Sequence, residues 1–206
     1  MKKAQKIQSL TRSVVVRLGG TGGQGLLLAG RLLAEAAALH DGRDILLTNS
    51  YGPEARGGAS RSEVVIGVGE IDILHASKVD VLVCLSQSAC DKYYDDLSGN
   101  GLLIVDATNV TVVPTSRVIE VPMTALAVHE LGNRMVTNVI SVGVLAGVTK
   151  IIAEPALMQA VETGTPAKFR KLNVDAARIG YRLGCELIAD KPARFRRMLV
   201  SYALDP

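Results

Sequence analysis

The chain has 206 residues, of which 48% are hydrophobic and 21% are charged, with 20 glycines, no tryptophan and a formal net charge of +3 at pH 7. This length predicts one domain that buries roughly 70% of its unfolded surface without needing disulfides. The positive charge lies at the chain ends, because residues 1–13 carry four basic and no acidic side chains, and residues 190–206 carry a surplus of two. The body therefore lacks the basic stripe of a nucleic-acid-binding protein.

The three cysteines, Cys84, Cys90 and Cys185, are widely spaced, and none belongs to a Cys-x-x-Cys pair. They argue against an iron–sulfur or zinc site within this chain and for a reducing compartment. No run approaches 18 uninterrupted apolar residues, so we expect a cytoplasmic protein without membrane contact. The histidines lie far apart and are interpreted as surface or capping residues, which leaves no predicted metal site: His40, His75 and His129.

The first half of the chain alternates short apolar runs with one helical pattern. We expect a helix rich in alanine and leucine that stops at Asp41-Gly42, and a continuous apolar run typical of a buried parallel strand. The predicted elements are a strand at Val14–Leu18, this helix at Leu26–His40, strands at Ile45–Thr48 and Ser62–Val68, a turn into Ile71–Leu74, and the buried strand at Val81–Cys84.

The second half is mostly helical. We expect a helix at Gln87–Leu97 broken by Ser98–Gly101, strands at Leu102–Asp106 and Arg117–Val121, a helix from an N-cap at Thr124 to Leu131, and helices at Val136–Ile152 and Pro155–Glu162. In a last helix, one apolar stripe (Leu172, Ala176, Ile179, Leu183 and Leu187) opposes a mixed-charge face (Lys171, Asp175, Arg178, Arg182 and Glu186). Gly143 and Gly147 predict a close approach by another element, and Asp95 and Asp96 are expected to face solvent.

Alternating strands and helices predict an α/β fold. We expect a single three-layer domain over residues 14–188, with a mostly parallel sheet, helices on both faces and a Rossmann-like glycine loop. Residues 1–13 and 189–206 are interpreted as basic extensions, of which the second is a tail or a docking segment.

The glycine loop is the segment Gly20-Thr-Gly-Gly-Gln-Gly25, which follows a strand and opens a helix. Its glycines permit a tight turn, and the helix N-terminus offers N–H groups to an anion. We predict a site for a phosphate or a partner backbone formed by Gly20, Gly22, Gly23, Gln24 and Gly25. A tight turn without a ligand is the alternative. NAD or FAD is disfavoured, because Thr48-Asn49-Ser50 stands where the ribose-binding acid should be, and Asp44 lies at the wrong end of its strand.

A second loop, Ser50-Tyr-Gly-Pro-Glu-Ala-Arg-Gly-Gly58, is far more specified than a strand connection requires. Glu54 and Arg56 share a face of an extended chain and could pair, or Arg56 could bind a carboxylate or phosphate. Both loops follow strand ends, so we expect them to be neighbours. The second loop contributes Tyr51, Glu54, Arg56, Gly57 and Gly58 to the predicted site. A loop that only shapes a subunit interface is equally compatible with the pattern. No catalytic residue is predicted.

Together these two loops resemble the gamma subunit of 2-oxoacid:ferredoxin oxidoreductases, most closely the 2-oxoglutarate type. The resemblance extends over residues 14–188, through Asp80–Gln87, Leu131–Asn138 and Leu172–Tyr181. It departs from the family's usual Pro-Asp at Val79-Asp80, and at the Leu-Gly pair that precedes Gly20.

The resemblance implies a non-autonomous subunit of an enzyme that decarboxylates a 2-oxoacid and forms an acyl-coenzyme A. It further implies alpha, beta and ferredoxin-like delta subunits, ferredoxin as electron acceptor, and thiamine diphosphate and iron–sulfur clusters held mainly by other chains. This chain would then supply architecture and part of the coenzyme A site. The competing hypotheses are a stand-alone nucleotide-binding module and a flavin or NAD reductase.

Overall fold

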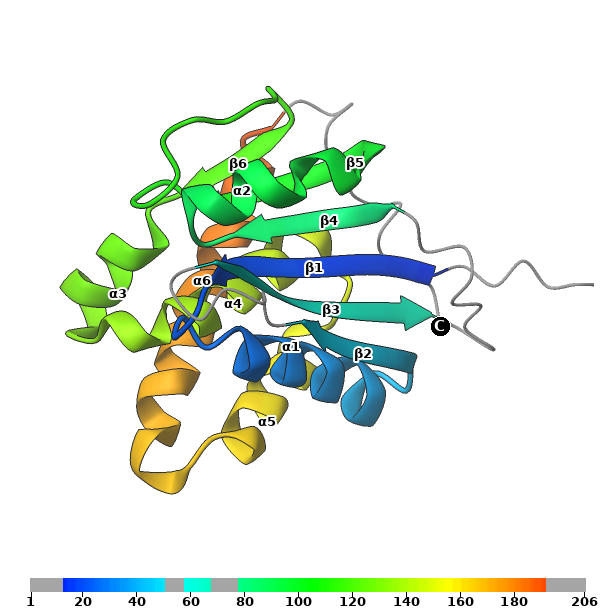
Figure 1. Ribbon diagram of the computed structural model, residues 1–206. Helices are drawn as coiled ribbons and strands as arrows, with labels where there is room; N and C mark the ends of the chain where they lie inside the picture. The colour runs from blue at the N-terminus through cyan, green and yellow to red at the C-terminus, as the bar shows by residue number, and fades with distance from the viewer. Residues whose placement is uncertain (1–12, 51–57, 68–77, 192–206) are drawn as a thin grey trace, which may run out of the picture.

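The computed structural model describes residues 13–50, 58–67 and 78–191 (Figure 1). They form one α/β domain around a six-stranded sheet of order β2-β3-β1-β4-β5-β6. The strands are β1 (Ser13–Thr21), β2 (Asp44–Ser50), β3 (Ala59–Gly67), β4 (Val79–Cys84), β5 (Leu97–Asp106) and β6 (Val118–Val121). The helices are α1 (Leu26–Glu35, continued by η1 at Ala36–His40), α2 (Gln87–Tyr93, followed by η3 at Tyr94–Asp96), α3 (Met123–Leu131), η4 (Arg134–Val136), α4 (Thr137–Thr149), α5 (Glu154–Gly164) and α6 (Ala167–Ala189).

The sheet is mostly parallel, with one reversed strand. β1, β4, β5 and β6 run parallel to one another, whereas β3 is inserted antiparallel between β1 and β2. This insertion pairs Thr21, the last residue of β1, with Ala59, the first residue of β3. The glycine loop therefore lies beside the start of β3, at the edge where the parallel strands end.

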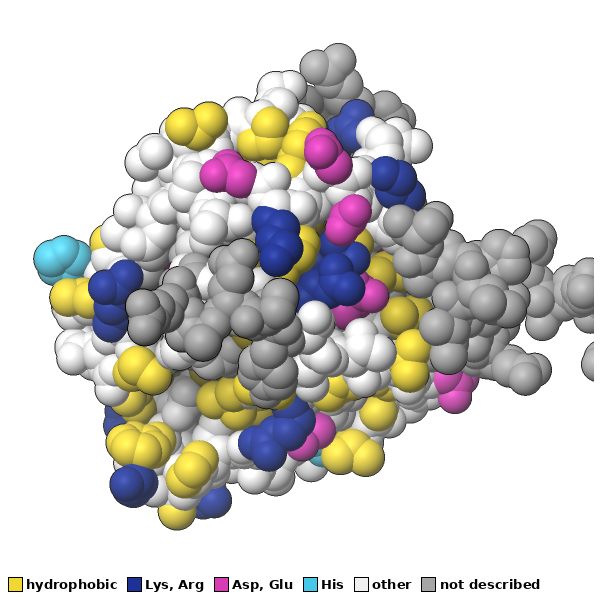
Figure 2. All heavy atoms as spheres, in the orientation of Figure 1, with side chains coloured by type: hydrophobic (Ala, Val, Ile, Leu, Met, Phe, Trp, Pro, Cys, Tyr) yellow, Lys and Arg dark blue, Asp and Glu magenta, His cyan; other side chains and the backbone are white. Residues whose placement is uncertain are grey.

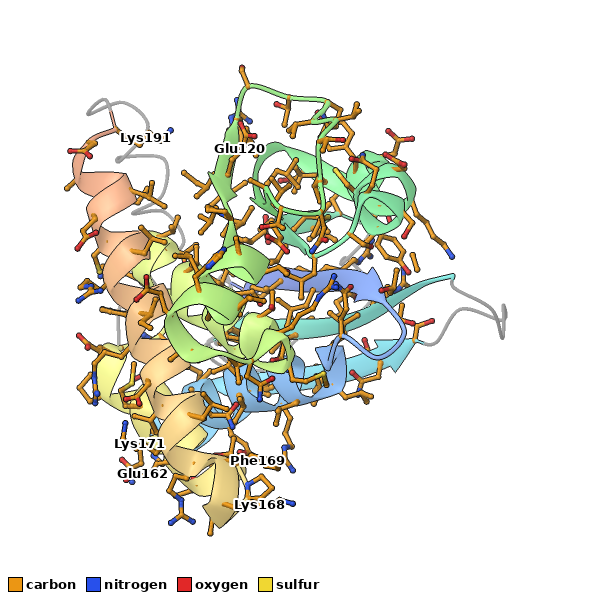
Figure 3. The ribbon with its side chains drawn as sticks, turned by 90° about the vertical axis from the view of Figure 1, so that its left-hand side faces the viewer. Glu120, Glu162, Lys168, Phe169, Lys171 and Lys191 are labelled. Atoms are coloured by element: carbon orange, nitrogen blue, oxygen red, sulfur yellow. The ribbon has the colours of Figure 1, made fainter. Side chains whose placement is uncertain are left out.

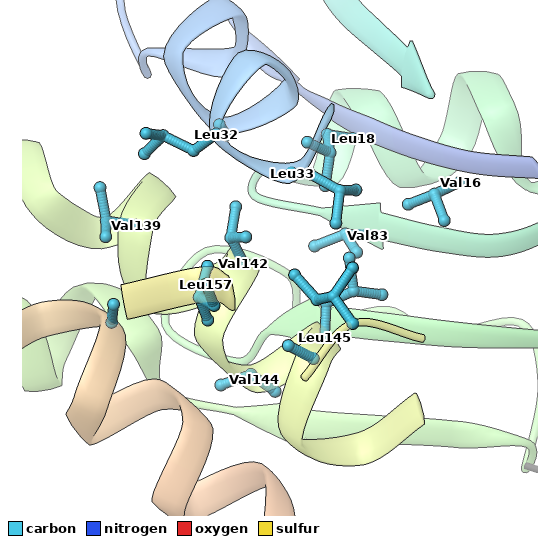
Figure 4. Packing of buried hydrophobic residues seen from close by; sticks show 14 of the residues in the cluster. Val16, Leu18, Leu32, Leu33, Val83, Val139, Val142, Val144, Leu145 and Leu157 are labelled. Carbon is cyan, nitrogen blue, oxygen red and sulfur yellow. The ribbon is translucent and has the colours of Figure 1, made fainter. Parts of the chain in front are cut away.

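Helices cover both faces of the sheet, as predicted. On one face α1 and α4 pack around an aliphatic core (Figure 4) that includes Leu18, Leu33, Val83 and Leu145, and α5 packs against α1, η1 and α6. On the other face α2 packs on the sheet around a smaller cluster that includes Leu82, Cys84, Ala89 and Tyr93. None of the described helices is long and apolar enough to cross a membrane.

The long helix α6 contacts α4 backbone to backbone. A Cβ on Gly143 would lie 2.4 Å from the carbonyl oxygen of Ala177, and a Cβ on Gly184 would lie 2.6 Å from that of Val144. The predicted close approach at Gly143 and Gly147 is confirmed. The predicted stripe of α6 is only partly right, because Ala177, Gly180 and Gly184 make the tightest contact while Leu172, Leu183 and Leu187 are only partly buried.

Several predicted boundaries are wrong. The helix that begins at Gln87 ends at Asp96, and Leu97 already belongs to β5, because it pairs with Val79 of β4. Thr124 is not an N-cap, since α3 begins at Met123 and Thr124 binds the carboxylate of Asp106 instead. The helix predicted to reach Ile152 ends at Thr149, where Lys150 takes a left-handed conformation with φ 56°.

Candidate functional site

The glycine loop turns sharply between β1 and α1. Gly23 and Gly25 have φ values of 86° and 72°, a region that only glycine adopts at low cost. The side-chain amide of Asn138 donates a 2.9 Å hydrogen bond to the carbonyl oxygen of Gly25. A Cβ at Gly25 would lie 2.4 Å from that amide nitrogen. Gly25 is thus required both by its conformation and by the contact with α4.

The side chain of Gln24 fastens the loop to the sheet. Its Oε1 accepts a 2.7 Å hydrogen bond from the backbone N–H of Thr21, and its Nε2 donates a 3.0 Å bond to the carbonyl oxygen of Leu85. A Cβ at Gly20 would lie 2.5 Å from Gln24 Oε1. Gly20 and Gln24 therefore shape the loop from within, and both ends of the Gln24 amide are engaged by this chain.

Gly22 and Gly23 form the open part of the loop. A Cβ on either residue would meet no described atom within 4 Å, and both residues are exposed. Gly22 also lacks the positive φ that would demand glycine. Nothing in the described part of the chain explains a glycine at position 22. Because glycine has no side chain, the backbone at this position is open to close approach by a ligand or another chain.

A small cavity of about 70 Å³ adjoins this open backbone. Its lining residues come from the glycine loop, α3, η4 and α4: Gly23, Gln24, Thr124, Arg134, Met135 and Thr137. Arg134 is exposed, and its guanidinium makes no ion pair with the described residues. Its charge and the nearby N-terminus of α1 both favour a negatively charged group at this place.

A buried carboxylate positions one wall of the cavity. Asp106, at the end of β5, accepts hydrogen bonds from the N–H of Thr124 at 3.1 Å, from the Thr124 hydroxyl at 2.5 Å and from the Asn109 amide at 2.6 Å. These bonds hold the start of α3 against the sheet. Sequence reasoning missed this role, although an aspartate that ends an apolar strand is a usable signal.

The structure brings the described part of the predicted site together at one sheet edge. Gly58 is half-buried and directly precedes Ala59, which pairs with Thr21 beside the glycine loop. Only the end of the second loop is thereby placed beside the glycine loop, and the expectation that the two loops are neighbours stays a prediction. The remaining predicted members lie outside the described residues: Tyr51, Glu54, Arg56 and Gly57.

A second polar cluster, on the α2 face of the sheet, was not predicted. Arg17 of β1 is only 7% exposed, and its guanidinium bonds Glu63 of β3 at 2.8 Å and the carboxylate of Asp96. The guanidinium also lies 5.4 Å from the centroid of the Tyr93 ring. Asp96 is therefore not simply solvent-facing, because a cation buried in the sheet requires a carboxylate partner.

The cysteines do not converge on a common site. Cys84 and Cys90 hydrogen-bond each other on the α2 face, and this bond, together with burial, raises the pKa of Cys84. Cys185 lies on α6, across the sheet, beside Lys150. The described residues also hold no group of three or more His, Cys, Asp or Glu side chains placed to bind a metal. An iron–sulfur cluster does not fit this donor set.

A family model and individual proteins are similar to this chain over most of its length. The model of the pyruvate ferredoxin/flavodoxin oxidoreductase family matches residues 15–183. The 2-oxoglutarate synthase subunit KorC of Methanocaldococcus jannaschii is 41% identical over 176 residues, which cover 84% of this chain and 94% of that protein. The subunit of the same name from Archaeoglobus fulgidus is 38% identical over 96% of this chain and 98% of its own length.

Solved structures with the same fold were also found. The gamma subunit of a keto/oxoacid ferredoxin oxidoreductase from Geobacter sulfurreducens superposes with a TM-score of 0.78 at 36% identity, covering 85% of this chain and 98% of its own. A 2-oxoglutarate:ferredoxin oxidoreductase from Magnetococcus marinus shares the fold at 19% identity, with a TM-score of 0.74 over 85% of this chain and 31% of that one. The chain therefore belongs to the pyruvate ferredoxin/flavodoxin oxidoreductase family.

Proposed function

We propose that this chain is the gamma subunit of a 2-oxoglutarate:ferredoxin oxidoreductase with alpha, beta and ferredoxin-like delta partners. The complex would convert 2-oxoglutarate and coenzyme A to succinyl-coenzyme A, CO₂ and a proton, and pass two electrons to ferredoxin. Relatives named as 2-oxoglutarate synthase subunits align with nearly the whole chain, which supports this substrate over pyruvate. Pyruvate synthase subunits match at only 26% identity.

The chain contributes binding and architecture, and other subunits contribute the cofactors. Thiamine diphosphate, when bound to the complex, supplies the carbanion chemistry of decarboxylation, and the clusters carry electrons. The separation of Cys84 and Cys90 from Cys185 argues against a cluster bound by the described residues. Its own residues would orient coenzyme A and close the complex around it.

The main support for a role in coenzyme A binding is the open backbone at Gly22 and Gly23. It lies beside the N-terminus of α1 and across a small cavity from Arg134. Backbone N–H groups at a helix start and a guanidinium are the usual partners of a phosphate oxygen. We assign this surface to a phosphate of coenzyme A, with Arg56 as a further cation from the second loop.

Co-purification and assay test the subunit role. The native chain should be isolated in stoichiometric complex with alpha, beta and delta chains, and the complex should reduce ferredoxin with 2-oxoglutarate and coenzyme A. The isolated chain should show no turnover. Isolation of the native chain without partners, or ferredoxin reduction by the chain alone, would contradict the proposal.

Substitution of Gly22 tests the coenzyme A role. In the reconstituted complex, Gly22→Leu should raise the KM for coenzyme A about tenfold, because a side chain would block approach to the backbone. Gly99→Leu is the matched control, since a Cβ on Gly99 also meets no described atom within 4 Å, but Gly99 lies in β5, away from the loop. Arg56→Ala should likewise weaken coenzyme A use. Unchanged KM values for coenzyme A in Gly22→Leu and Arg56→Ala would contradict the proposal that coenzyme A binds to this surface.

A further inference from the structure

Exposed apolar side chains gather at the end of the domain where the parallel strands terminate. Six large apolar side chains are exposed in the described part of the chain, and four of them lie on elements around this end: Leu27 (44%), Val128 (46%), Met135 (66%) and Phe169 (44%). We name these four, with Arg134 and Lys168, the carboxyl-end face. Of the other two, Val112 follows the carboxyl end of β5 and is held by the side chain of Gln87 at the start of α2, whereas Leu39 lies in η1, at the far end of the α1 helix, and serves below as a control.

The members of the carboxyl-end face are linked through the fold. Met135 shares the cavity wall with Gly23, and Leu27 follows Gly25 by two residues. Helix α6, whose first turn holds Lys168 and Phe169, packs against both α3 and η4 (Figure 3). In Figure 2 apolar and basic side chains lie among one another at the lower left, where Figure 1 places the start of α6. A mixed apolar and basic surface of this kind, next to open backbone, is typical of a protein interface.

The charges of α6 divide into two groups. Farther along the helix, Lys171 and Arg178 pair with Asp175 at 2.7 and 3.7 Å, and Arg182 pairs with Glu186 at 3.8 Å. In contrast, Lys168 and Arg134 form no ion pair with described residues, and Lys168 lies over the Phe169 ring at 4.7 Å. Because Arg134 is assigned above to the phosphate of coenzyme A, Lys168 is the cation of the carboxyl-end face that is available to an external carboxylate.

The position of Lys168 makes such a carboxylate favourable. It lies in the first turn of a 23-residue helix, at the positive end of the helix dipole, and that turn contains no acidic residue. A positive charge is disfavoured there unless a negative charge approaches. The surface consequently selects an acidic partner.

We propose that the carboxyl-end face docks another subunit of the same oxidoreductase complex, one that presents an apolar patch bordered by carboxylates. This inference rests on the proposed function and adds which surface assembles. The matched fold covers only 31% of the Magnetococcus marinus chain, so there the domain is joined to further protein in one polypeptide. Here a separate subunit would cover the apolar side chains of Met135 and Phe169.

Association of the full chain with the remaining subunits tests the docking. The double variant Met135→Glu/Phe169→Glu should bind roughly 30-fold more weakly, because it removes two apolar anchors and repels carboxylates. Leu39→Glu, which alters an exposed apolar residue at the opposite end of the α1 helix, should bind within about twofold of the native chain. Lys168→Gln should bind more weakly at low salt and should lessen the effect of added salt.

Each alternative has its own result. If the native chain assembles and Met135→Glu/Phe169→Glu assembles equally well with unchanged thermal unfolding, the docking face is refuted while the proposed function stands. If the native chain does not assemble, the proposed function fails and the docking fails with it. If the isolated chain dimerises and the same double variant abolishes the dimer, the occupant is a second copy and the proposal is overturned. Met135→Gln/Phe169→Gln replaces the double variant if that variant does not fold.

Discussion

Gly143 of α4 and Gly180 of α6 pack directly against each other: a Cβ added to Gly143 would lie 3.0 Å from the Cα of Gly180 and 2.8 Å from the backbone nitrogen of Tyr181. Reciprocally, a Cβ on Gly180 would lie 2.2 Å from the carbonyl oxygen of Ile140. All 13 residues of α4 are buried, so the helix cannot move aside without disturbing the core. The α4–α6 distance is thus set by the absence of two side chains.

Gly143→Ala should destabilise the fold by about 1–3 kcal/mol, because the new methyl group would push α6 away, and this cost exceeds the gain in helix propensity. Chemical denaturation of the isolated chain measures the change. Gly22→Ala is the control, since its Cβ meets no described atom within 4 Å. Equal stability of Gly143→Ala and the native chain would show that the helices are less tightly packed than described.

The Arg17–Glu63 pair is predicted to be strongly coupled. Arg17→Met leaves Glu63 without its cation, whereas Glu63→Gln leaves Arg17 paired with Asp96, so Arg17→Met should destabilise by roughly 2–4 kcal/mol and Glu63→Gln by less. The double variant should lose less than the sum, because Arg17→Met already removes the cation with which Glu63 pairs. A double-mutant cycle from denaturant midpoints measures the coupling. Strict additivity would contradict a direct interaction between the two side chains.

Lys150 is expected to give the fold a stability contribution that is lost only at alkaline pH. Burial lowers the pKa of Lys150, but hydrogen bonds to Cys185 and Tyr181, at 2.7 and 3.0 Å, outweigh burial and raise that pKa above the ordinary lysine value. A cation with a raised pKa stabilises the folded state below the ordinary value and ceases to do so as the pH rises through the raised one.

Lys150→Gln should therefore be less stable than the native chain at about pH 8, and the difference should shrink as the pH rises above about 10.4. Unfolding curves at several pH values measure this convergence. Lys171→Gln, on the solvated face of α6, is the control and should show little effect at any of these values. A pH-independent difference would assign the effect of Lys150→Gln to packing rather than charge.

Gln24 is predicted to act on the shape of the glycine loop. Gln24→Ala removes the hydrogen bonds to Thr21 and Leu85 and should cost about 1–2 kcal/mol of stability while speeding amide exchange at Thr21. Gln24→Glu retains an acceptor for Thr21 but places a carboxylate against the Leu85 carbonyl oxygen. It should therefore be at least as destabilising as Gln24→Ala. Hydrogen exchange followed by mass spectrometry reports on the loop. Unchanged exchange at Thr21 in both variants would refute the role of Gln24.

Local pattern was enough to predict much of this protein. Short segments were enough to predict the alternation of strands and helices and the glycine turn before Leu26. They were also enough to predict the close approach at Gly143 and Gly147 and the family resemblance. Such features depend on neighbours within a few positions of the chain. They could be predicted because backbone conformation and helical spacing are local properties.

Pairing across the sheet was decided only by the tertiary structure. The antiparallel insertion of β3 beside β1 places Glu63 against Arg17 and Ala59 against Thr21, and the pairing of Leu97 with Val79 converts a predicted helix end into strand β5. Each contact joins residues that are far apart in sequence, so no local pattern encodes it. The amino-acid sequence determined which segments form elements and which turn carries the glycine loop. The folded sheet determined which buried charges meet and which apolar side chains remain exposed beside that loop.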